Sequence, residues 1–435
     1  MECNPTRICE LLVGLPEVNV LGVDDDGDGP LRVHVESRVE RVWCRGCGGR
    51  AAVKDRPRVE LVDLPCFGRP TRLVWHKHRW CCRGCGAGSW TIIDDRIAPR
   101  RAAMTDRAGR WCTEHVGRSG RTVAEVAREL RCDWHTVNDA VIAYGSALID
   151  EDTSRIGDVD ALGLDETLFC RRGPRRIQQW CTSIVDVSSG RPAQLLDVVA
   201  GRSAAGPSAW LDARADQWRT AIRYGVLDLS GPYRKTFNDT LPDATQVADP
   251  FHVVKLANTK LDECRRRVQN ETLGHRGRKD DPLFRARRLL TKGHERLDDK
   301  GETKVLSLLE AGDPRGEVRM SWHAKETLRG LYDIDNPAIA AEYIDELIGD
   351  LADTSMPTEV RSLGRTLARW RDHIIAWHQA FVSNGPTEAI NNLIKRIKRI
   401  GFGFRKFAHY RIRALLYAGR PNWDLLNDIH PAQIR

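Results

Sequence analysis

Apolar residues recur with two different spacings along the chain, and the change of spacing separates its regions. Short runs with a period of two, such as Leu31–Val35, predict small strands within residues 1–98. Helical spacing takes over in residues 99–150. The strand-like runs in the middle of the chain are Val159–Phe169, Gln178–Val187, Ala193–Val199, Tyr224–Leu229 and Thr245–Val247. The stretch Ala209–Arg223, between the third and fourth runs, has the spacing of a helix.

The remainder of the chain is predicted to be helical. From Phe251 to about Ala380 the pattern is helical and heavily charged, and a basic helix and tail occupy residues 386–435. Asn384-Gly-Pro386 favours a helix start at this point, since proline is common at the first helical position. One face of the final helix is apolar and comprises Ile390, Leu393, Ile394, Ile397 and Ile400. The opposite face comprises Glu388, Asn391, Asn392, Lys395 and Arg399.

Residues 121–144 have the pattern of a helix-turn-helix. The apolar side of the first helix consists of Val123, Val126, Ala127 and Leu130. Arg131-Cys132-Asp133 forms the turn, and a second helix follows from Trp134 to Tyr144. Small Ala127 would let the two helices cross closely, as a DNA-reading unit requires. A plain helical hairpin remains an alternative, because Arg131 stands where a glycine is usual. The candidate DNA contacts of the second helix are Trp134, His135 and Asn138.

Composition limits the class of protein. The chain has 435 residues, a formal net charge of +8 and 41% hydrophobic residues, which suits a soluble globular protein of about three domains. No apolar run approaches the roughly 20 residues that a membrane span needs, and the N-terminus lacks the pattern of a signal peptide. Thirteen cysteines without a secretion signal indicate reduced thiols and metal sites rather than disulfides. We therefore expect a cytoplasmic protein.

The positive charge gathers near the end of the chain. Residues 389–413 contain eight Lys or Arg and no Asp or Glu, and they include several aromatic residues. Basic and aromatic side chains together suit a nucleic-acid strand, although a solvated surface is the alternative. The candidate DNA contacts are Asn392, Lys395, Arg396, Lys398, Arg399, Arg405 and Lys406.

Two CxxC pairs predict a metal site. Cys44-Arg-Gly-Cys47 and Cys82-Arg-Gly-Cys85 each place two thiolates on a tight turn, and each is followed by glycine. Two such pairs complete a tetrahedral Cys₄ site, which indicates structural rather than catalytic Zn²⁺. The fourth ligand is open, because Cys81, His76 and His78 lie close by in the sequence.

Isolated acidic residues in the strand region are candidate ligands. Asp165 shares a strand face with small residues such as Gly163, which leave space for an ion or a phosphate. Asp228 lies at the carboxyl end of a short apolar strand, where open α/β sheets place their ligands. A turn or capping role is the alternative for either residue. Glu388, at the start of the final helix with amides and cations beyond it, could hold a metal while the cations grip a phosphate backbone.

These motifs, taken in order, resemble bacterial insertion-sequence transposases of the ISL3 family. The resemblance covers nearly the whole chain, and the C-terminal block is its most specific part. Besides the two CxxC pairs and the helix-turn-helix, it rests on Gly163-Leu-Asp-Glu166, Gly231-Pro-Tyr-Arg-Lys235, Ala248-Asp-Pro-Phe-His-Val-Val-Lys255, Ser383-Asn-Gly-Pro-Thr-Glu-Ala-Ile-Asn-Asn392, Lys395-Arg-Ile-Lys-Arg399 and Gly401-Phe-Gly-Phe-Arg-Lys-Phe407.

The resemblance implies an RNase H-like mixed-sheet catalytic core with three carboxylates. The first maps to Asp165 and the last to Glu388. For the middle carboxylate we favour Asp228 over Asp249, because relatives with a helical insertion carry a Cys/Asp-x-x-His motif roughly twenty residues after the middle Asp. Asp249-Pro-Phe-His252 begins 21 residues after Asp228 and fits that position. Asp249 and His252 would then be supporting residues.

The same resemblance implies a domain order and a set of partners. We expect a zinc-binding domain at 1–98, a helix-turn-helix domain at 99–155, and a catalytic domain at 156–435 with an all-helical insertion at about 255–380. The zinc ribbon and helix-turn-helix would recognise the terminal inverted repeats of the element. Double-stranded DNA, both transposon ends and target, would be the partner, with a homodimer assembled on it. The protein would be cytoplasmic and bacterial, and associated with the nucleoid when bound to DNA.

The expected chemistry is phosphodiester cleavage followed by strand transfer. Two Mg²⁺ (or Mn²⁺) ions about 3.5–4 Å apart would activate the nucleophile and stabilise the leaving oxyanion. Asp165 would bridge the ions, and Asp228 and Glu388 would each complete one. Two alternatives remain, namely a zinc-dependent DNA-binding regulator without catalysis and a nuclease of similar core that cuts without strand transfer.

Overall fold

The computed structural model describes residues 2–38 and 41–431 and divides the chain into two compact units. The terminal unit comprises Met1–Gly157 and Asn392–Arg435, and the central unit comprises Asp158–Asn391. Helix α14 (Gly385–Ile400) contributes residues to both. The sequence analysis assigned 156–435 to one catalytic domain, whereas this division places the last 44 residues, 392–435, with the start of the chain.

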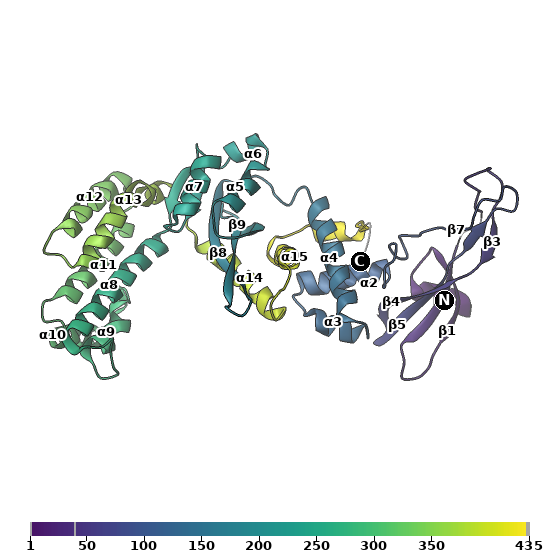
Figure 1. The fold of residues 1–435 in the computed structure, drawn as a ribbon, viewed down its shortest axis with the longest axis horizontal. Coiled ribbons are helices and arrows are strands. Elements are labelled where there is room, and N and C mark those ends of the chain that lie inside the picture. Colours follow the sequence, from purple (N-terminus) through teal and green to yellow (C-terminus); the bar gives the residue numbers. More distant parts are fainter. Residues whose placement is uncertain (1, 39–40, 432–435) are drawn as a thin grey trace. The chain divides into compact units, whose positions relative to one another are not determined.

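Two small sheets and one helix form the beginning of the terminal unit (Figure 1). A four-stranded sheet has the order β1-β2-β5-β4, and a three-stranded sheet has the order β3-β6-β7. The core of the larger sheet contains Val35, Leu73 and Trp75, all at most 1% exposed. The elements are α1 (Pro5–Val13), β1 (Val18–Asp24), β2 (Leu31–Ser37), β3 (Ala52–Asp55), β4 (Arg58–Cys66), β5 (Arg69–His76), β6 (Arg79–Cys81) and β7 (Trp90–Thr91). The alternation of Leu31–Val35 is thereby confirmed as strand.

Two helices joined by a turn form where the helix-turn-helix pattern predicts them. Helix α3 begins after a capping box in which Thr122 and Glu125 bond reciprocally. Arg131 turns the chain into the next helix with a left-handed φ of 46°, the conformation for which glycine is usual. The helices before the central unit are α2 (Asp106–Thr113), the π-helical turn η1 (Glu114–Arg118), α3 (Val123–Glu129) and α4 (Trp134–Glu151).

The C-terminal helix α15 (Phe407–Ala418) completes the core of this helical region. Ile412 and Leu416 are buried in one cluster with Val126, Val137 and other residues of α3 and α4. Gly145 of α4 permits the close packing, because a Cβ there would lie 2.8 Å from Leu416 Cδ1. A short 3₁₀ turn, Trp423–Asn427, follows. The helix-turn-helix therefore buries its apolar face against the chain's last helix.

A five-stranded mixed sheet forms the core of the central unit (Figure 1). Its order is β10-β9-β8-β11-β12; β8, β9 and β10 are antiparallel neighbours, whereas β11 runs parallel to both β8 and β12. The strands are β8 (Ala161–Arg172), β9 (Ile177–Asp186), β10 (Gln194–Ala200), β11 (Tyr224–Leu227) and β12 (Thr245–Ala248). All five predicted strands are confirmed within a few residues.

Helices complete the central unit. Helices α5, α6 and α7 lie among the strands in sequence, and α8–α13 form a long helical segment between β12 and α14 (Figure 1). Their bounds are α5 (Ala205–Asp212), α6 (Asp216–Thr220), α7 (Gly231–Thr240), α8 (Pro250–Leu273), α9 (Pro282–Leu290), α10 (Asp299–Gly312), α11 (Glu317–Gly330), α12 (Pro337–Ala352) and α13 (Thr358–Ala380), with 3₁₀ turns at His294–Arg296 and Leu331–Asp333. The charged helical pattern from Phe251 to Ala380 is thus helix, as predicted.

Candidate active site and metal centre

Two acidic residues lie side by side on the central sheet. Strand β8 pairs in parallel with β11, and Leu164 is the register partner of Leu227. Asp165 is the next residue of β8 and Asp228 is the residue that follows β11, so the pairing brings them to the same level at this edge of the sheet. Both side chains are half-buried.

One carboxylate oxygen of Asp228 lacks a hydrogen-bond partner. Its Oδ1 atom is buried and has no hydrogen-bond partner among the described residues. Burial, followed by the nearby charge of Asp165, raises the pKa of Asp228 from 3.8 to about 6. Native proteins rarely leave a buried carboxylate oxygen unpaired, so this arrangement fits a cation ligand.

Asp249 is used differently. It caps helix α8, and its Oδ2 atom accepts hydrogen bonds from the His252 backbone N–H and from His252 Nδ1 at 3.3 and 2.9 Å. Its Oδ1 atom accepts one from the Asn384 backbone N–H at 2.8 Å. The side chain is 2% exposed. Both oxygens of Asp249 are therefore committed within the protein.

His252 connects Asp249 to Glu388. The Nε2 atom of His252 lies 3.7 Å from Glu388 Oε1. Burial lowers the pKa of His252, but the hydrogen bond and charge of Asp249, with the charge of Asp228, outweigh it and raise that pKa above its ordinary value. Glu388 is 41% exposed and remains accessible to solvent.

The start of helix α14 rests against strand β8 because position 163 is glycine. A Cβ on Gly163 would lie 2.2 Å from Thr387 Oγ1 and 3.0 Å from Asn384 Oδ1. Thr387 and Asn384 are themselves fully buried. The Gly in Gly163-Leu-Asp165 thus sets the approach of the helix that carries Glu388.

Asn391 holds the Asp165 carboxylate in one orientation through a hydrogen bond. Its Nδ2 donates to Asp165 Oδ2 at 2.7 Å, and its Oδ1 accepts from Ser183 Oγ at 2.7 Å. Ser183 is the register partner of Asp165 on β9. The sequence analysis placed Asn391 on one face of this helix but did not name it as a site residue; its spacing of three from Glu388 was the available signal.

Asp165, Asp228 and Glu388 thus lie on or beside one sheet, with His252 and Asn391 contacting two of them. Such a set of oxygen ligands suits Mg²⁺ or another hard divalent cation, and the unpaired Asp228 oxygen is the observation that such an ion would satisfy. The carboxylates are not closed into a cage. Among residues 2–38 and 41–431, the cysteine cluster is the group of three or more potential metal ligands whose atoms all lie within 4.8 Å of one another. The three carboxylates do not meet that distance limit.

The cysteine cluster comprises Cys44, Cys47, Cys82 and Cys85. The Sγ atoms of Cys44 and Cys85 lie 3.6 Å apart, as do those of Cys47 and Cys82. The backbone N–H of Gly84, with that of Cys85, lowers the pKa of Cys82 to about 6, which favours the thiolate that binds metal. Four thiols gathered this closely form a possible zinc site.

The neighbouring alternatives for the fourth ligand are engaged elsewhere. His78 Nε2 bonds Glu36, and His76 Nε2 lies 3.0 Å from His34 Nδ1. Neither residue belongs to the cluster, and Cys81 does not either. The four thiols that lie together are thus those of the two CxxC pairs.

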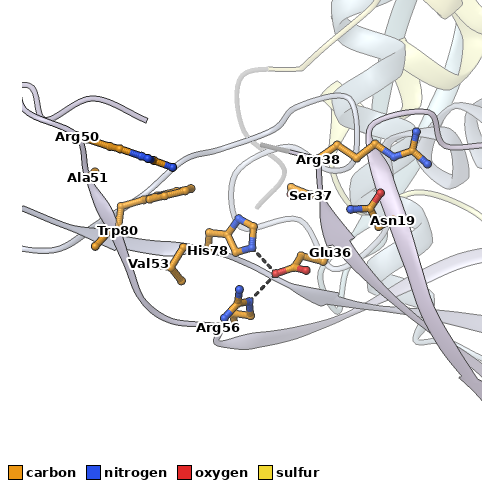
Figure 2. A pocket seen from close by; sticks show the side chains of 11 residues that line it. Asn19, Glu36, Ser37, Arg38, Arg50, Ala51, Val53, Arg56, His78 and Trp80 are labelled. Carbon is orange, nitrogen blue, oxygen red and sulfur yellow. Dashed lines mark hydrogen bonds and ion pairs between the residues drawn. The ribbon is translucent and has the colours of Figure 1, made fainter. Parts of the chain in front are cut away.

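A basic groove lies beside the small sheets. Figure 2 shows His78 and Arg56 both directed at Glu36, while Arg50 and Trp80 lie on the other side of His78. The groove has a volume of about 700 Å³. Arginines next to a tryptophan give this surface the chemistry of a phosphate or nucleic-acid contact.

The candidate DNA contacts differ in accessibility. Trp134 is 46% exposed, whereas Asn138 is 6% exposed and donates to Asp139. His135 is exposed. Of the basic stretch, Asn392, Lys395, Arg396, Arg399, Arg405 and Lys406 are exposed and Lys398 is half-buried. All except Asn138 can therefore meet a partner directly.

Comparison with known proteins decides the family. The ISL3 family model, described as "Transposase", matches residues 162–414, which is more than half of the chain. The chain belongs to the ISL3 transposase family. It is similar to the transposase for insertion sequence element IS1557 of Mycobacterium tuberculosis, with 28% identity over 83% of this chain and 86% of that protein. It is also similar to the transposase for IS1001 of Bordetella parapertussis, with 27% identity over 90% of this chain and 92% of that protein.

This ISL3 transposase is therefore a DNA transposase, an enzyme that cuts and transfers DNA strands. A chain in the Drosophila P element transposase strand transfer complex aligns with 74% of it at a TM-score of 0.39 and 9% identity, covering 94% of that chain; the assignment does not depend on this alignment. No helix in the described part of the chain is both long and apolar enough to span a membrane.

Proposed function

We propose that this transposase cuts at the ends of its insertion sequence and joins them to target DNA by a DDE reaction on an RNase H-like core. Asp165, Asp228 and Glu388 would hold two divalent cations, Mg²⁺ or Mn²⁺. The observation that carries the proposal is the buried, unpartnered Oδ1 atom of Asp228 beside Asp165. The mixed sheet, with one acid on β8 and another directly after the parallel neighbour β11, supports the RNase H-like assignment.

The commitment of Asp249 supports Asp228 as the middle carboxylate. Asp249 has both oxygens bonded to neighbouring groups and caps a helix. A metal ligand at that position would have to give up those bonds, whereas Asp228 gives up none at Oδ1. Asp249 then acts by orienting His252 towards Glu388.

The residues have distinct tasks in the reaction. Bound divalent cations would activate the attacking oxygen and stabilise the leaving oxyanion. Asn391 fixes the orientation of Asp165 through a 2.7 Å hydrogen bond. His252, whose pKa is raised, places its Nε2 atom 3.7 Å from Glu388 Oε1 and in its charged form would attract that carboxylate. Exposed Lys395, Arg396 and Arg399 would neutralise backbone phosphates of the bound DNA.

The terminal unit would recognise DNA. A structural Zn²⁺ in the Cys₄ cluster would hold the residues of the small sheets, and the helix-turn-helix would read the terminal inverted repeats with the N-terminal part of α4. Of the expected domains, 1–98 would bind zinc, 99–155 would read the repeats, and 156–435, with the insertion at about 255–380, would carry the catalytic site. Because two transposon ends must be joined together, we propose a homodimer on DNA.

Strand cleavage and joining by the purified full-length protein test the proposal. The substrate is DNA carrying the element's ends, which are identifiable as inverted repeats flanking the gene, with Mg²⁺ present. We expect cut and joined products from the wild type, none from Asp165→Asn, and wild-type products from Asp243→Asn, an exposed loop residue that serves as control. Equal products from Asp165→Asn and wild type would refute the catalytic assignment. Cut products that are never joined would favour a nuclease, and binding without cleavage would favour a regulator.

A further inference from the structure

One arginine in the terminal unit is buried without a counter-ion. Arg413 on α15 is 3% exposed, and its Nε and Nη2 atoms have no hydrogen-bond partner among the described residues. Burial alone lowers the pKa of its guanidinium to about 10, with no acidic neighbour raising it. The Phe404 ring lies beside the guanidinium of Arg413, with its centroid 5.9 Å from the Cζ atom. A buried unpaired cation destabilises a fold, and a ligand that accepts hydrogen bonds from Arg413 would relieve that cost.

Arg413 lines a cavity that is suited to a small planar molecule. The cavity has a volume of about 540 Å³, within the roughly 300–1,000 Å³ of typical ligand sites. Its walls come from the N-terminal ends of α3 and α4 and from the loop before α15. They include Thr122, Trp134, His135 and Phe404. Aromatic rings on the walls and an unpaired donor among them form a surface on which a base can stack while its edge accepts hydrogen bonds.

The acidic residue that lines the cavity does not form an ion pair with Arg413. Asp139 is the acidic residue in the lining, and it accepts a hydrogen bond from Asn138 Nδ2 at 3.1 Å. No ion pair between Asp139 and Arg413 is present among the described residues, and Asp139 acts on His409 instead. The other ionisable residues of the lining, His135, Arg405, Lys406 and His409, are bases.

The cavity mouth carries an exposed aromatic residue. Phe402 is 95% exposed and has a left-handed φ of 50°, between Gly401 and Gly403. That conformation is unfavourable for a residue with a side chain. Exposure of the phenyl ring to water is also unfavourable, because its apolar surface is not buried. An apolar side chain presented in this way can insert between stacked bases.

We propose that this cavity receives one nucleotide turned out of the DNA duplex, with its base stacked against Trp134 and its edge hydrogen-bonded by Arg413. Phe402 occupies the space that the base leaves in the stack. A phosphate of an intact duplex would meet exposed Arg405 and Lys406 on the outside, whereas Arg413 belongs to the lining of the cavity. The inference rests on the proposed function, because it presupposes binding to transposon ends.

Binding to end DNA with single unpaired bases tests this inference. Each base of the terminal repeat in turn is placed opposite an abasic site, and the affinity of the full-length protein is compared with that for paired DNA. Unpairing in advance removes the cost of extrusion, so at one position the wild type should bind about tenfold more tightly or better. Arg413→Met should lose this gain.

Two further variants keep the test independent of folding. Arg413→Met should have an unchanged or higher Tm, because it removes a buried unpaired cation. Arg265→Met, a buried arginine that pairs with Asp262 at 2.6 Å, should lower the Tm and keep the gain. Trp134→Ala, at a half-exposed position, should lose much of the gain through lost stacking.

Three results would overturn the inference: no position with a gain, a gain retained in both Arg413→Met and Trp134→Ala, or a fall in Tm for Arg413→Met equal to that of Arg265→Met. If the wild type binds and cleaves its end DNA but shows no gain, the cavity proposal fails and the proposed function stands. If it binds no end DNA, the proposed function itself fails.

Discussion

The cysteine cluster and the carboxylate site are both candidate metal centres, and they are built in opposite ways. The four Sγ atoms come from two CxxC turns and already lie within 4.8 Å of one another. The carboxylates come from β8, the end of β11 and the start of α14, and they are not gathered to that degree. The first site is closed by local turn geometry, whereas the second depends on the packing of the whole central unit.

The difference corresponds to two roles for a bound ion. A closed tetrahedral site has no open position and contributes folding energy. An open set of carboxylates, one of them unpaired and with a raised pKa, leaves room for substrate oxygens and costs stability until an ion binds. The comparison therefore predicts that metal removal acts on folding at one site and on catalysis at the other.

The largest expected effect is on the cysteine cluster. Cys82→Ser, or a zinc-selective chelator, should unfold the small sheets, because structural zinc contributes on the order of 10 kcal/mol to the folding of such sites. Calorimetry should show a lost or lowered transition for the terminal unit and an unchanged one for the central unit. Cys264→Ser, at a buried thiol outside the cluster, is the control. If the calorimetric unfolding transition of the terminal unit is unchanged in Cys82→Ser, the four thiols do not form a structural zinc site.

The next effect separates Asp228 from Asp249. Asp228→Asn should lower the rate of strand cleavage by roughly 10³-fold or more, because it removes charge that stabilises the transition state through the bound ion. Asp249→Asn should act mainly on folding, since it weakens a helix cap worth about 1 kcal/mol and the bond to His252. Single-turnover cleavage and urea unfolding of both variants measure this. The assignment is reversed if Asp249→Asn loses cleavage while keeping wild-type stability, and Asp228→Asn keeps cleavage.

A smaller effect links Asp228 to pH. Its folded-state pKa of about 6 lies above the ordinary value of 3.8, so the folded protein holds this proton more tightly. Stability from this group is complete below about pH 4 and is lost as the pH rises through about 6, by about 3 kcal/mol. Asp228→Asn should therefore be the more stable protein at about pH 8 and similar to wild type at about pH 4.

Urea unfolding with and without Mg²⁺ measures this pH effect. Added Mg²⁺ should recover stability in the wild type and not in Asp228→Asn. If the free energies of unfolding of the two proteins change in parallel with pH, the ionised Asp228 carboxylate does not destabilise the fold.

The smallest effect concerns Asn391. Asn391→Ala should lower the cleavage rate by about 10–100-fold, because partners that orient metal ligands contribute at this level. The loss should shrink when Mn²⁺ replaces Mg²⁺, since a less demanding ion tolerates a mobile Asp165 ligand better. Asn392→Ala, the exposed neighbour, should leave the cleavage rate of a pre-bound complex unchanged. Equal rates for Asn391→Ala and wild type would remove Asn391 from the site.

Much of the fold could be predicted from the sequence because it rests on local patterns. The strand pattern of Val159–Phe169, the helix start at Pro386 and the CxxC spacing are decided by a few neighbouring residues, and all three are confirmed. The packing of α15 into the helix-turn-helix core could not be predicted, because Gly145 and Leu416 are far apart in the sequence and each has many possible partners.

The sequence by itself determined the family, the order of the elements and the cysteine site, since each follows from short-range spacing or from motifs read in order. Only the tertiary structure decided which polar groups are left unsatisfied. Asp228 and Asp249 both follow short strands, yet one has an unpaired oxygen and the other has none free. Arg413 is one basic residue among eight until burial removes it from solvent. Desolvation depends on everything that surrounds a group, so it is a property of the folded chain.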